Sequence, residues 1–482
     1  MKKLIYIILM IAFSQTLLAQ QSSTAYFMQT LTQTQWLNPA VKNECKLTIG
    51  GALVPITGQL FLPINVNYGN NGFAFKDLVQ YNSNIDSLIL PGFKGYDWDQ
   101  LMNKLKEVNY ITEEVHLNWL TIGYKYKDWD FGFVINDKIE NRLSFNKDLF
   151  LFAKEGNGQS FLNETANLGD LGITGTVYTE YELRASKKIN DKLTIGIAAK
   201  ALFGKMNVWT EKSVIDVHTS SNENYPITVN TDILVHTSQP FTEVTEMYYD
   251  YDADSMVFES IEKDADFNTM YWNTKNFGLG FDIGATYKLN KKIELYASLI
   301  DMGYIKWKDN VQTFSVKGEY YWDGYNFQPS LTEDEELITE TNDSLKDDII
   351  KIFEPKLQKD SYTSHLTPKL YLGGTYQLTE KIRGGLLLRG AFFQHAMHPS
   401  LTLSGNFKIN KWLETTASYS MINNTYSNIG LGFVAKAKWF QFFMISDNIW
   451  GFIWPQATQN VNFRMGINLV FGCKKKEDST RM

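Results

Sequence analysis

The strongest constraint on the fold is the stretch of residues 461–471, close to the end of the 482-residue chain. Apolar and polar residues alternate along it with a period of two, which is the pattern of a β-strand with two unlike faces. One face is apolar, and the other carries one arginine and two asparagines. Eleven residues are many for an ordinary strand but suit one that crosses a bilayer at a tilt. A strand crosses lipid only when both edges are paired, so the stretch predicts a closed β-barrel.

The N-terminus predicts a signal peptide over residues 1–19. Lys2 and Lys3 precede an apolar run at residues 4–18, and the small residue Ala19 follows. No cysteine follows that run directly, which argues against a lipoprotein. No other apolar run is long enough for a helical span. The mean hydropathy of −0.26 does not exclude a barrel, because only one face of each strand is apolar.

Composition favours an all-β envelope protein. Aromatic residues make up 14% of the chain, with 26 Tyr, 31 Phe and 12 Trp. Aromatic girdles at two membrane interfaces would use them, although a large secreted β-protein could do so too. The net charge of −7 argues against a nucleic-acid partner.

A short hairpin recurs along the chain and joins alternating strands. Its copies lie at residues 188–193, 288–293, 377–382 and 408–413. In the adjoining strands, charge falls only on the glycine-rich face, whereas a soluble sandwich would place charge outside. The opposite strand ends lead into polar stretches, which we predict to be long loops: residues 138–171, 209–275 and 309–364. Short turns at one end and long loops at the other are typical of bacterial outer-membrane barrels, with the turns in the periplasm.

Counting strands back from the last one predicts about fourteen, within a range of twelve to sixteen. Residues 46–53 and 60–68 are strand-like, and the sequence leaves open whether they form one bent strand or two. Helical spacing predicts a helix at residues 99–108 and an amphipathic helix within the acidic segment 333–354.

Several segments in a fixed order resemble a known group of proteins. They are residues 37–40, 370–376, 399–404, 417–420, 428–432, 446–449 and 462–472. Together they resemble an uncharacterised outer-membrane β-barrel family of the Bacteroidota, similar to PorP/SprF-like proteins and more distantly to the FadL and PorV barrels. The resemblance implies a plug at residues 20–44, a barrel at 45–472 and a periplasmic tail at 473–482. It also implies a plug or gate role for Asn38, Pro39 and Ala40.

The inward faces of the predicted strands carry charges that we expect to line the lumen. They are Arg184, Lys200, Asp282, Lys288, Arg383, Arg389, Lys436 and Arg464. Basic residues outnumber acidic ones in this set, although the whole chain is acidic. This excess predicts either a modest preference for anions or ion pairs with the plug.

The two cysteines, Cys45 and Cys473, are a candidate disulfide pair. In a closed barrel the first and last strands are neighbours, and these residues lie near the start of one and just past the end of the other. The sequence does not fix their separation, so two unpaired thiols are the favoured interpretation.

Two clusters are candidate metal sites. Asp250, Asp252 and Asp254 alternate as calcium-binding carboxylates can, but Ser255 and Ile261 occupy the positions where an EF-hand loop needs glycine and glutamate. A solvated acidic loop is therefore the favoured interpretation. His395 and His398 lack an evident third ligand. No nucleophile motif or phosphate loop is present, so the sequence predicts neither an enzyme nor a cofactor.

Two functions remain open. The first is a FadL-like channel for small solutes, hydrophobic ones included. The second is a non-conducting structural or adaptor barrel associated with type IX secretion or gliding machinery. The expected partners are outer-membrane lipid and lipopolysaccharide, the barrel-assembly machinery during insertion, and, for the second function, periplasmic or surface secretion components.

Overall fold

The computed structural model describes residues 23–60, 62–222, 224–250, 255–262, 267–323, 356–393, 396–422 and 425–473. The predicted signal peptide at residues 1–19 and the predicted helix at residues 333–354 lie outside these ranges. Within the described ranges, no helix is long and apolar enough to cross a membrane.

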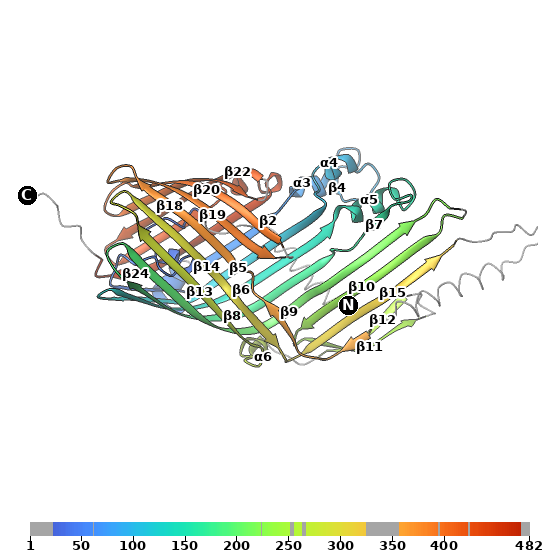
Figure 1. Ribbon diagram of the computed structural model, residues 1–482, viewed down its shortest axis with the longest axis horizontal. Helices are drawn as coiled ribbons and strands as arrows, with labels where there is room; N and C mark the ends of the chain where they lie inside the picture. Colours follow the sequence, from blue (N-terminus) through green and yellow to red (C-terminus); the bar gives the residue numbers. More distant parts are fainter. Residues whose placement is uncertain are drawn as a thin grey trace, which may run out of the picture.

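The chain folds into a closed antiparallel β-barrel, as the sequence predicted (Figure 1). The described strands fill fourteen positions, with β24 pairing with β23 on one side and with β1 and β2 on the other. In order around the barrel the strands are β1 (Leu47–Gly50) with β2 (Ile64–Asn70), β5 (Val108–Tyr126), β6 (Trp129–Asn146), β8 (Gly172–Lys188), β9 (Leu193–Thr219), β13 (Phe277–Lys288), β14 (Ile293–Trp307), β17 (Tyr362–His365) with β18 (Lys369–Gln377), β19 (Ile382–Phe393), β20 (Ala396–Lys408), β21 (Leu413–Ile422), β22 (Thr425–Ala437), β23 (Phe440–Ser446) and β24 (Asn460–Phe471).

The first position holds two short strands. Both β1 and β2 pair with β24 and with β5, so they continue one line interrupted by residues 51–63. Helix α2 (Pro55–Leu60) occupies the interruption and packs against β24. The sequence left open whether residues 46–53 and 60–68 form one bent strand or two. The structure has two strands that share one position in the barrel.

Alternation along β9 and β13 follows the predicted register. Ile197 and Phe281 are exposed on the outer face, while Lys200 and Asp282 are buried on the inner face. The two strands pair directly, with Phe281 opposite Ala199 and Asp282 opposite Ala198. The outer faces therefore form an apolar belt of the kind that a bilayer covers.

The last strand departs from its predicted pattern on the outer face. Val461, Ile467 and Leu469 belong to the apolar face of β24 but are buried. Helix α2 and helix α8 (Trp450–Ile453) both pack against this strand, and Gly451 of α8 lies against Val461. Part of this face therefore contacts the chain itself.

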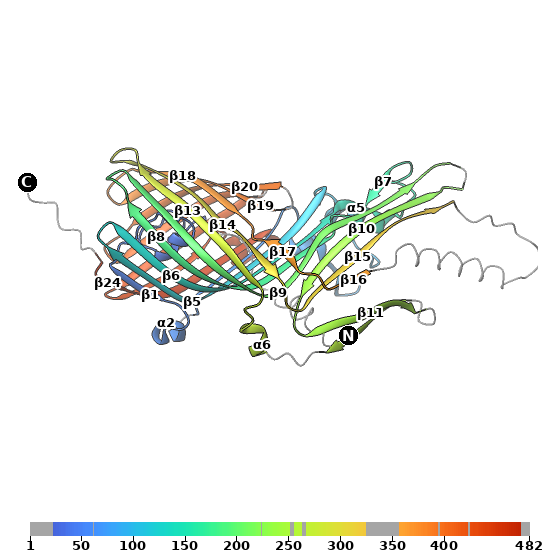
Figure 2. The same cartoon turned by 60° about the horizontal axis from the view of Figure 1, so that its bottom comes forward.

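Parts of the predicted long loops are strands, which corrects the expectation for the described portions of residues 138–171, 209–275 and 309–364. Strand β6 continues to Asn146 and β9 to Thr219. The wall also gains β10 (Ile227–Ser238), which pairs with the upper part of β9, then β15 (Val311–Trp322) and β16 (Lys356–Gln358). Strands β10 and β15 carry the wall well past the ends of β13 and β14, as Figures 1 and 2 show. The backbone hydrogen bonds of these strands are made by neighbouring strands. Because water lies on both faces of this part of the sheet, its apolar and polar residues need not alternate strictly.

Smaller elements lie at the two ends and on the outside of the barrel, except η1, which lies inside the lumen. They are η1 (Thr32–Trp36), α3 (Phe75–Leu78), β3 (Gln80–Asn82), β4 (Ser87–Ile89), α4 (Trp98–Met102), α5 (Lys147–Glu155), β7 (Thr165–Asn167), β11 (Thr242–Asp250), β12 (Ser255–Glu262), α6 (Phe267–Tyr271) and η2 (Pro455–Ala457). Helix α4 is shorter than the predicted helix at residues 99–108, because Val108 already begins β5. Its Leu101 joins Phe73 and Phe145 in an apolar cluster at the end opposite the short turns.

Cys45 and Cys473 are joined by a disulfide, with their Cα atoms 3.8 Å apart. The favoured interpretation of two unpaired thiols is therefore wrong in this structure. The pairing of Leu47 with Phe471 explains the result, because it brings the two flanking cysteines together where the barrel closes.

Candidate functional site: the barrel lumen

Residues 23–44 fill the lumen at the end of the barrel that carries the short turns. The segment contains no strand, and almost all of its side chains are buried. Its only regular element is the 3₁₀ turn η1. We call residues 23–44 the plug; the sequence placed the plug at residues 20–44, and residues 20–22 lie outside the described ranges.

Hydrogen bonds join the plug to many separate strands. The Thr24 N–H donates to Asp447 Oδ1 at 2.8 Å, Gln33 Nε2 to Asn468 Oδ1 at 2.9 Å, Gln441 Nε2 to the Thr30 carbonyl at 2.6 Å, and Gln35 Nε2 to Asp130 Oδ1 at 3.2 Å. The Thr30 hydroxyl also donates to Glu414. Buried polar groups need such partners, and here the polar inner faces of the strands supply them.

An apolar cluster also holds the plug. Its Tyr26, Phe27, Met28 and Leu31 pack with side chains that point inward from the wall. Tyr26 stacks on Tyr371 with ring centroids 5.2 Å apart. The plug is thus anchored by both hydrophobic burial and hydrogen bonds.

Asn38, Pro39 and Ala40 lie at a close contact between the plug and the wall. The Asn38 amide donates to Tyr26 Oη at 3.2 Å, and the Ala40 N–H donates to Asn38 Oδ1 at 2.9 Å. Gly196 and Gly284 face this segment, and a Cβ atom on either glycine would collide with Asn38 or Pro39. Glycine is needed at these two wall positions because the plug backbone approaches so closely.

Most of the predicted lumen charges that lie at the plug level contact the plug directly. Arg383 donates to the Phe27 carbonyl, and Lys436 Nζ lies 2.9 Å from Glu44 Oε2. The Arg464 guanidinium lies 5.6 Å from the centre of the Trp36 ring. Pairing with the plug is therefore one use of the basic residues.

Arg184 contacts the plug indirectly. Its Nη2 lies 3.6 Å from Asp130 Oδ1, and the same carboxylate accepts hydrogen bonds from plug residues Gln35 and Asn43. Two predicted residues lie elsewhere. Arg389 has its guanidinium 5.9 Å from the Tyr371 ring centre. Lys288 is exposed at the rim, which corrects its placement inside the lumen.

Lys200 and Asp282 belong to a buried ion network above the plug. Lys200 Nζ lies 2.8 Å from Asp282 Oδ2, 2.8 Å from Asp301 Oδ1 and 3.5 Å from Glu180 Oε2. Lys138 and Lys369 complete it, at 2.8 Å from Glu180 and 3.2 Å from Asp301 respectively. We call these six residues the ion network: Lys138, Glu180, Lys200, Asp282, Asp301 and Lys369.

The ion network adds two inward acids, Glu180 and Asp301, to the predicted set of lumen charges. Glu180 shares the inward register of Arg184, a signal that was present in the sequence and was missed. Asp301 was not foreseeable from alternation, because a β-bulge in the β13–β14 pairing lies at its level and its φ is 57°. The bulge places Ile300 and Asp301 on the inner side in succession.

Below the plug, at the short-turn end, a cavity of about 910 Å³ opens between the turns. Nine lysines line it: Lys42, Lys125, Lys188, Lys192, Lys288, Lys408, Lys411, Lys436 and Lys438. The acids among its lining residues are Glu44, Asp191 and Glu294, so this mouth is strongly basic. We call it the lower cavity.

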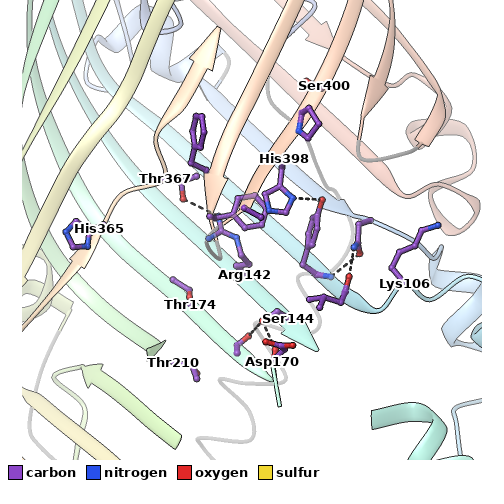
Figure 3. Close-up of a pocket in the computed structure, with 18 of the residues that line it drawn as sticks. Lys106, Arg142, Ser144, Asp170, Thr174, Thr210, His365, Thr367, His398 and Ser400 are labelled. Atoms are coloured by element: carbon purple, nitrogen blue, oxygen red, sulfur yellow. Dashed lines mark hydrogen bonds between the residues drawn. The ribbon is translucent and has the colours of Figure 1, made fainter. Parts of the chain in front are cut away.

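At the opposite end, a second cavity of about 970 Å³ lies above the ion network. Arg142 of β6 and His398 of β20 lie together at its centre, while Lys106 lies toward its edge (Figure 3). Asp170 and Ser144 lie on another side, where the Ser144 hydroxyl donates to the Asp170 carbonyl at 2.8 Å. We call it the upper cavity; of its lining residues, the sequence pointed to His398 as a candidate metal ligand and to residues 399–401 as part of the family resemblance.

The candidate metal ligands are not brought together in the part of the chain that the structure describes. No group of three or more His, Cys, Asp or Glu residues there is placed to hold a metal ion. The calcium candidates Asp250, Asp252 and Asp254 are not tested: Asp252 and Asp254 lie outside the described residues, as does His395, and Asp250 ends β11 with its side chain undescribed.

Solved structures similar to this chain include outer-membrane proteins. A crystal structure of a Pseudomonas aeruginosa FadL homologue shares 10% identity over 95% of this chain and 96% of its own, with a TM-score of 0.37. The Pseudomonas putida toluene transporter TodX shares 10% identity over 90% and 91%, with a TM-score of 0.34. The translocator domain of the Neisseria meningitidis autotransporter NalP shares 8% identity over 95% and 100%, with a TM-score of 0.32.

No curated protein sequence matches the chain. One family model does, over residues 39–447, and its description is "Family of unknown function (DUF5723)". The match runs from the plug to the loop after β23 and covers well over half of the sequence. The chain therefore belongs to the DUF5723 family.

Proposed function

We propose that this protein is an outer-membrane channel for a small solute, held closed by its plug. The observation that carries the proposal is the order of parts along the lumen. The upper cavity, the ion network, the plug and the lower cavity follow one another from one mouth to the other. The two cavities provide room for a solute at both ends, and only chain groups separate them.

Polar contacts make up a large part of the partition between the cavities, beside the apolar cluster around Tyr26. The upper part of the partition is the ion network, and the plug below it is bound to the wall through hydrogen bonds such as Gln33 to Asn468. Water can replace such partners when a segment moves, whereas burial of apolar surface is lost on exposure. The polar part of the partition therefore supports a closure that can be released.

The orientation follows from the two ends of the wall. The short turns and the lower cavity would face the periplasm, and the extended wall with the upper cavity would face outward. Outer-membrane lipid and lipopolysaccharide would then surround the apolar belt, and the barrel-assembly machinery would insert the chain. The Bacteroidota origin, the kinship with PorP/SprF-like proteins and the absence of enzyme activity stay predictions.

Conductance in planar lipid bilayers tests the proposal. The intact barrel should be mostly silent, and a variant lacking residues 20–44 should conduct steadily. A chain lacking residues 474–482 is the control, because it is shortened at the other end and keeps the plug; it should behave as the intact protein does.

Silence of both the intact and the plug-deleted protein would contradict the proposal, provided that a heat-modifiability gel shows folded barrels. That outcome would favour the non-conducting adaptor, for which no feature of the described residues speaks specifically. Binding of periplasmic proteins to the silent barrel would then be the next measurement.

A further inference from the structure

The upper cavity contains a stacked arrangement built from separate parts of the wall. Phe393 ends β19 and His398 lies near the start of β20, and their rings stack with centroids 3.5 Å apart and planes 5° from parallel. The Arg142 guanidinium lies 3.8 Å from the centre of the same Phe393 ring. Two groups cannot occupy one face of a ring at these distances, so Phe393 is sandwiched between the arginine and the histidine.

Tyr110 of β5 fixes the histidine. Its hydroxyl lies 3.1 Å from His398 Nδ1, and its ring meets the His398 and Phe393 rings edge to face. Tyr110 is itself buried. The arrangement is therefore held in place before any ligand arrives, which lowers the cost of binding.

Arg142 is only partly satisfied by the protein. Its Nη2 donates to Thr367 Oγ1 at 3.2 Å, as Figure 3 shows, while its Nε is buried and has no partner. No carboxylate of the described residues lies within ion-pair distance of it, in contrast to Lys200 in the ion network. A guanidinium has five N–H donors in a planar fork that matches a carboxylate.

The lining of the cavity is mixed in polarity, and part of it suits an apolar body. Trp209 and the buried Leu366 supply apolar surface, the acids Asp170 and Glu211 belong to the polar part, and Met421 is exposed on the outer face of β21. Cavities of this size are large enough to enclose a small organic molecule. A buried polar group without a partner calls for one, and in a cavity a ligand can supply it. Arg142 shares this feature with Arg184, Arg383, Arg389 and Arg464, and differs from them in lining the upper cavity.

We propose that the upper cavity binds a small organic carboxylate, with the carboxylate on Arg142 and the apolar body against Tyr110, Trp209 and Leu366. The upper cavity would be the entry site of the channel. The inference therefore rests on the proposed function and names the substrate class of that channel. The excess of lysines at the lower cavity is consistent with the exit of an anion, because it lowers the potential energy of a negative solute there.

Binding of benzoate to the full-length barrel in detergent, measured by isothermal titration, tests the inference. Benzamide is the matched probe, because it has the same ring and shape without the charge. Benzoate should bind at least about tenfold more tightly than benzamide, since hydrogen bonds to charged groups are the stronger ones. Equal binding of the two probes, or no binding of benzoate, would overturn the proposal.

Variants assign the binding to Arg142. Arg142→Gln should weaken benzoate binding about tenfold or more and leave benzamide binding within about twofold. Lys106→Gln is the matched control: it removes the same charge from the exposed edge of the cavity and should change benzoate binding less than about threefold. Equal losses from the two variants would mean that the cavity attracts anions without a built site, and would reject the proposal.

If heat-modifiable mobility on a gel shows that Arg142→Gln does not fold, benzoate binding is measured with Arg142→Lys instead. Lysine keeps the charge but lacks the planar fork and the stacking surface, so benzoate should still bind measurably more weakly than to the wild type. The proposed binding site and the proposed channel function can be rejected independently of each other. Benzoate binding without conductance in the plug-deleted barrel would reject the channel alone, and conductance without benzoate binding would reject the site alone.

Discussion

The two halves of the lumen use arginine in different ways. In the plugged half, Arg383 donates to the Phe27 carbonyl and Arg464 lies over Trp36, so plug groups contact the wall cations. In the open half, Arg142 has Thr367 as its one hydrogen-bond partner among the described residues and stacks on Phe393. In one half, the barrel wall therefore binds a segment of its own chain, the plug. In the other half, it leaves a cavity that we propose binds an external ligand. The ion network separates the two regions.

The largest expected effect comes from breaking the boundary between the halves. Lys200→Gln leaves Asp282, Asp301 and Glu180 without their central cation, and removing one partner of a buried network costs about 3–5 kcal/mol. Urea unfolding of the detergent-solubilised barrel measures this loss. Lys212→Gln is the control on the same strand, because Lys212 pairs with Asp232 on the exposed upper wall and should contribute at most about 1 kcal/mol. Equal losses would show that the ion network does not hold the boundary.

The next effect comes from pushing the plug away from the wall. Gly284→Ala places a methyl group against Asn38 and Pro39, and overpacking of this kind costs about 1–3 kcal/mol. Because only the plugged state is penalised, the open fraction should rise about fivefold to more than a hundredfold. Single-channel recordings measure the open probability. Gly374→Ala on β18 is the control, since its added methyl group would meet the exposed Leu295 and neither the plug nor the ion network; an equal rise there would contradict the interpretation.

A smaller effect is expected from one hydrogen bond of the plug. Glu414 accepts from both the N–H and the hydroxyl of Thr30. Glu414→Gln keeps the shape but removes the charge that strengthens these bonds, so the plugged state should lose about 1–2 kcal/mol. Faster cleavage of the plug by a protease added on the short-turn side would report its release. Unchanged cleavage would mean that the apolar cluster around Tyr26 alone holds the plug.

The smallest effect is expected at the rim. Lys436 and Glu44 form an ion pair at 2.9 Å, but the Glu44 side chain is 35% exposed. Lys436→Gln should therefore change stability and open probability by at most about 1 kcal/mol. A large rise in conductance would show that the rim, and not the deeper contacts, closes the channel.

The sequence predicted the membrane-embedded wall well and the upper wall poorly, and β9 shows why. Below residue 204, lipid on one side and a polar lumen on the other force a strict alternation, and residues 193–203 follow it. Above that level, water lies on both sides, and polar residues such as Lys212 occupy strand positions that look like loop. The upper part of β9 is held by backbone hydrogen bonds to β10. The residues of one strand do not reveal which strand it pairs with, so the sequence did not predict this pairing.

The candidate site was predictable only where it obeyed alternation. Lys200, Asp282 and Arg383 were found by their register, whereas Asp301 was hidden by its bulge. Arg142 was missed because it lies in the part of β6 that was expected to be a loop. The plug position of Asn38 came from a resemblance, since nothing in residues 23–44 reveals which strands they contact.

The disulfide gives the chain the connectivity of a lariat. Residues 45–473 form a covalent ring, and the plug is the tail of that ring, folded back inside it. Because the tail begins at Cys45, it can leave the lumen only by swinging about that residue and cannot diffuse away. A short tether holds residues 23–44 at an effective concentration on the order of millimolar. Release and return of the plug are therefore a unimolecular equilibrium, independent of how many barrels the membrane holds.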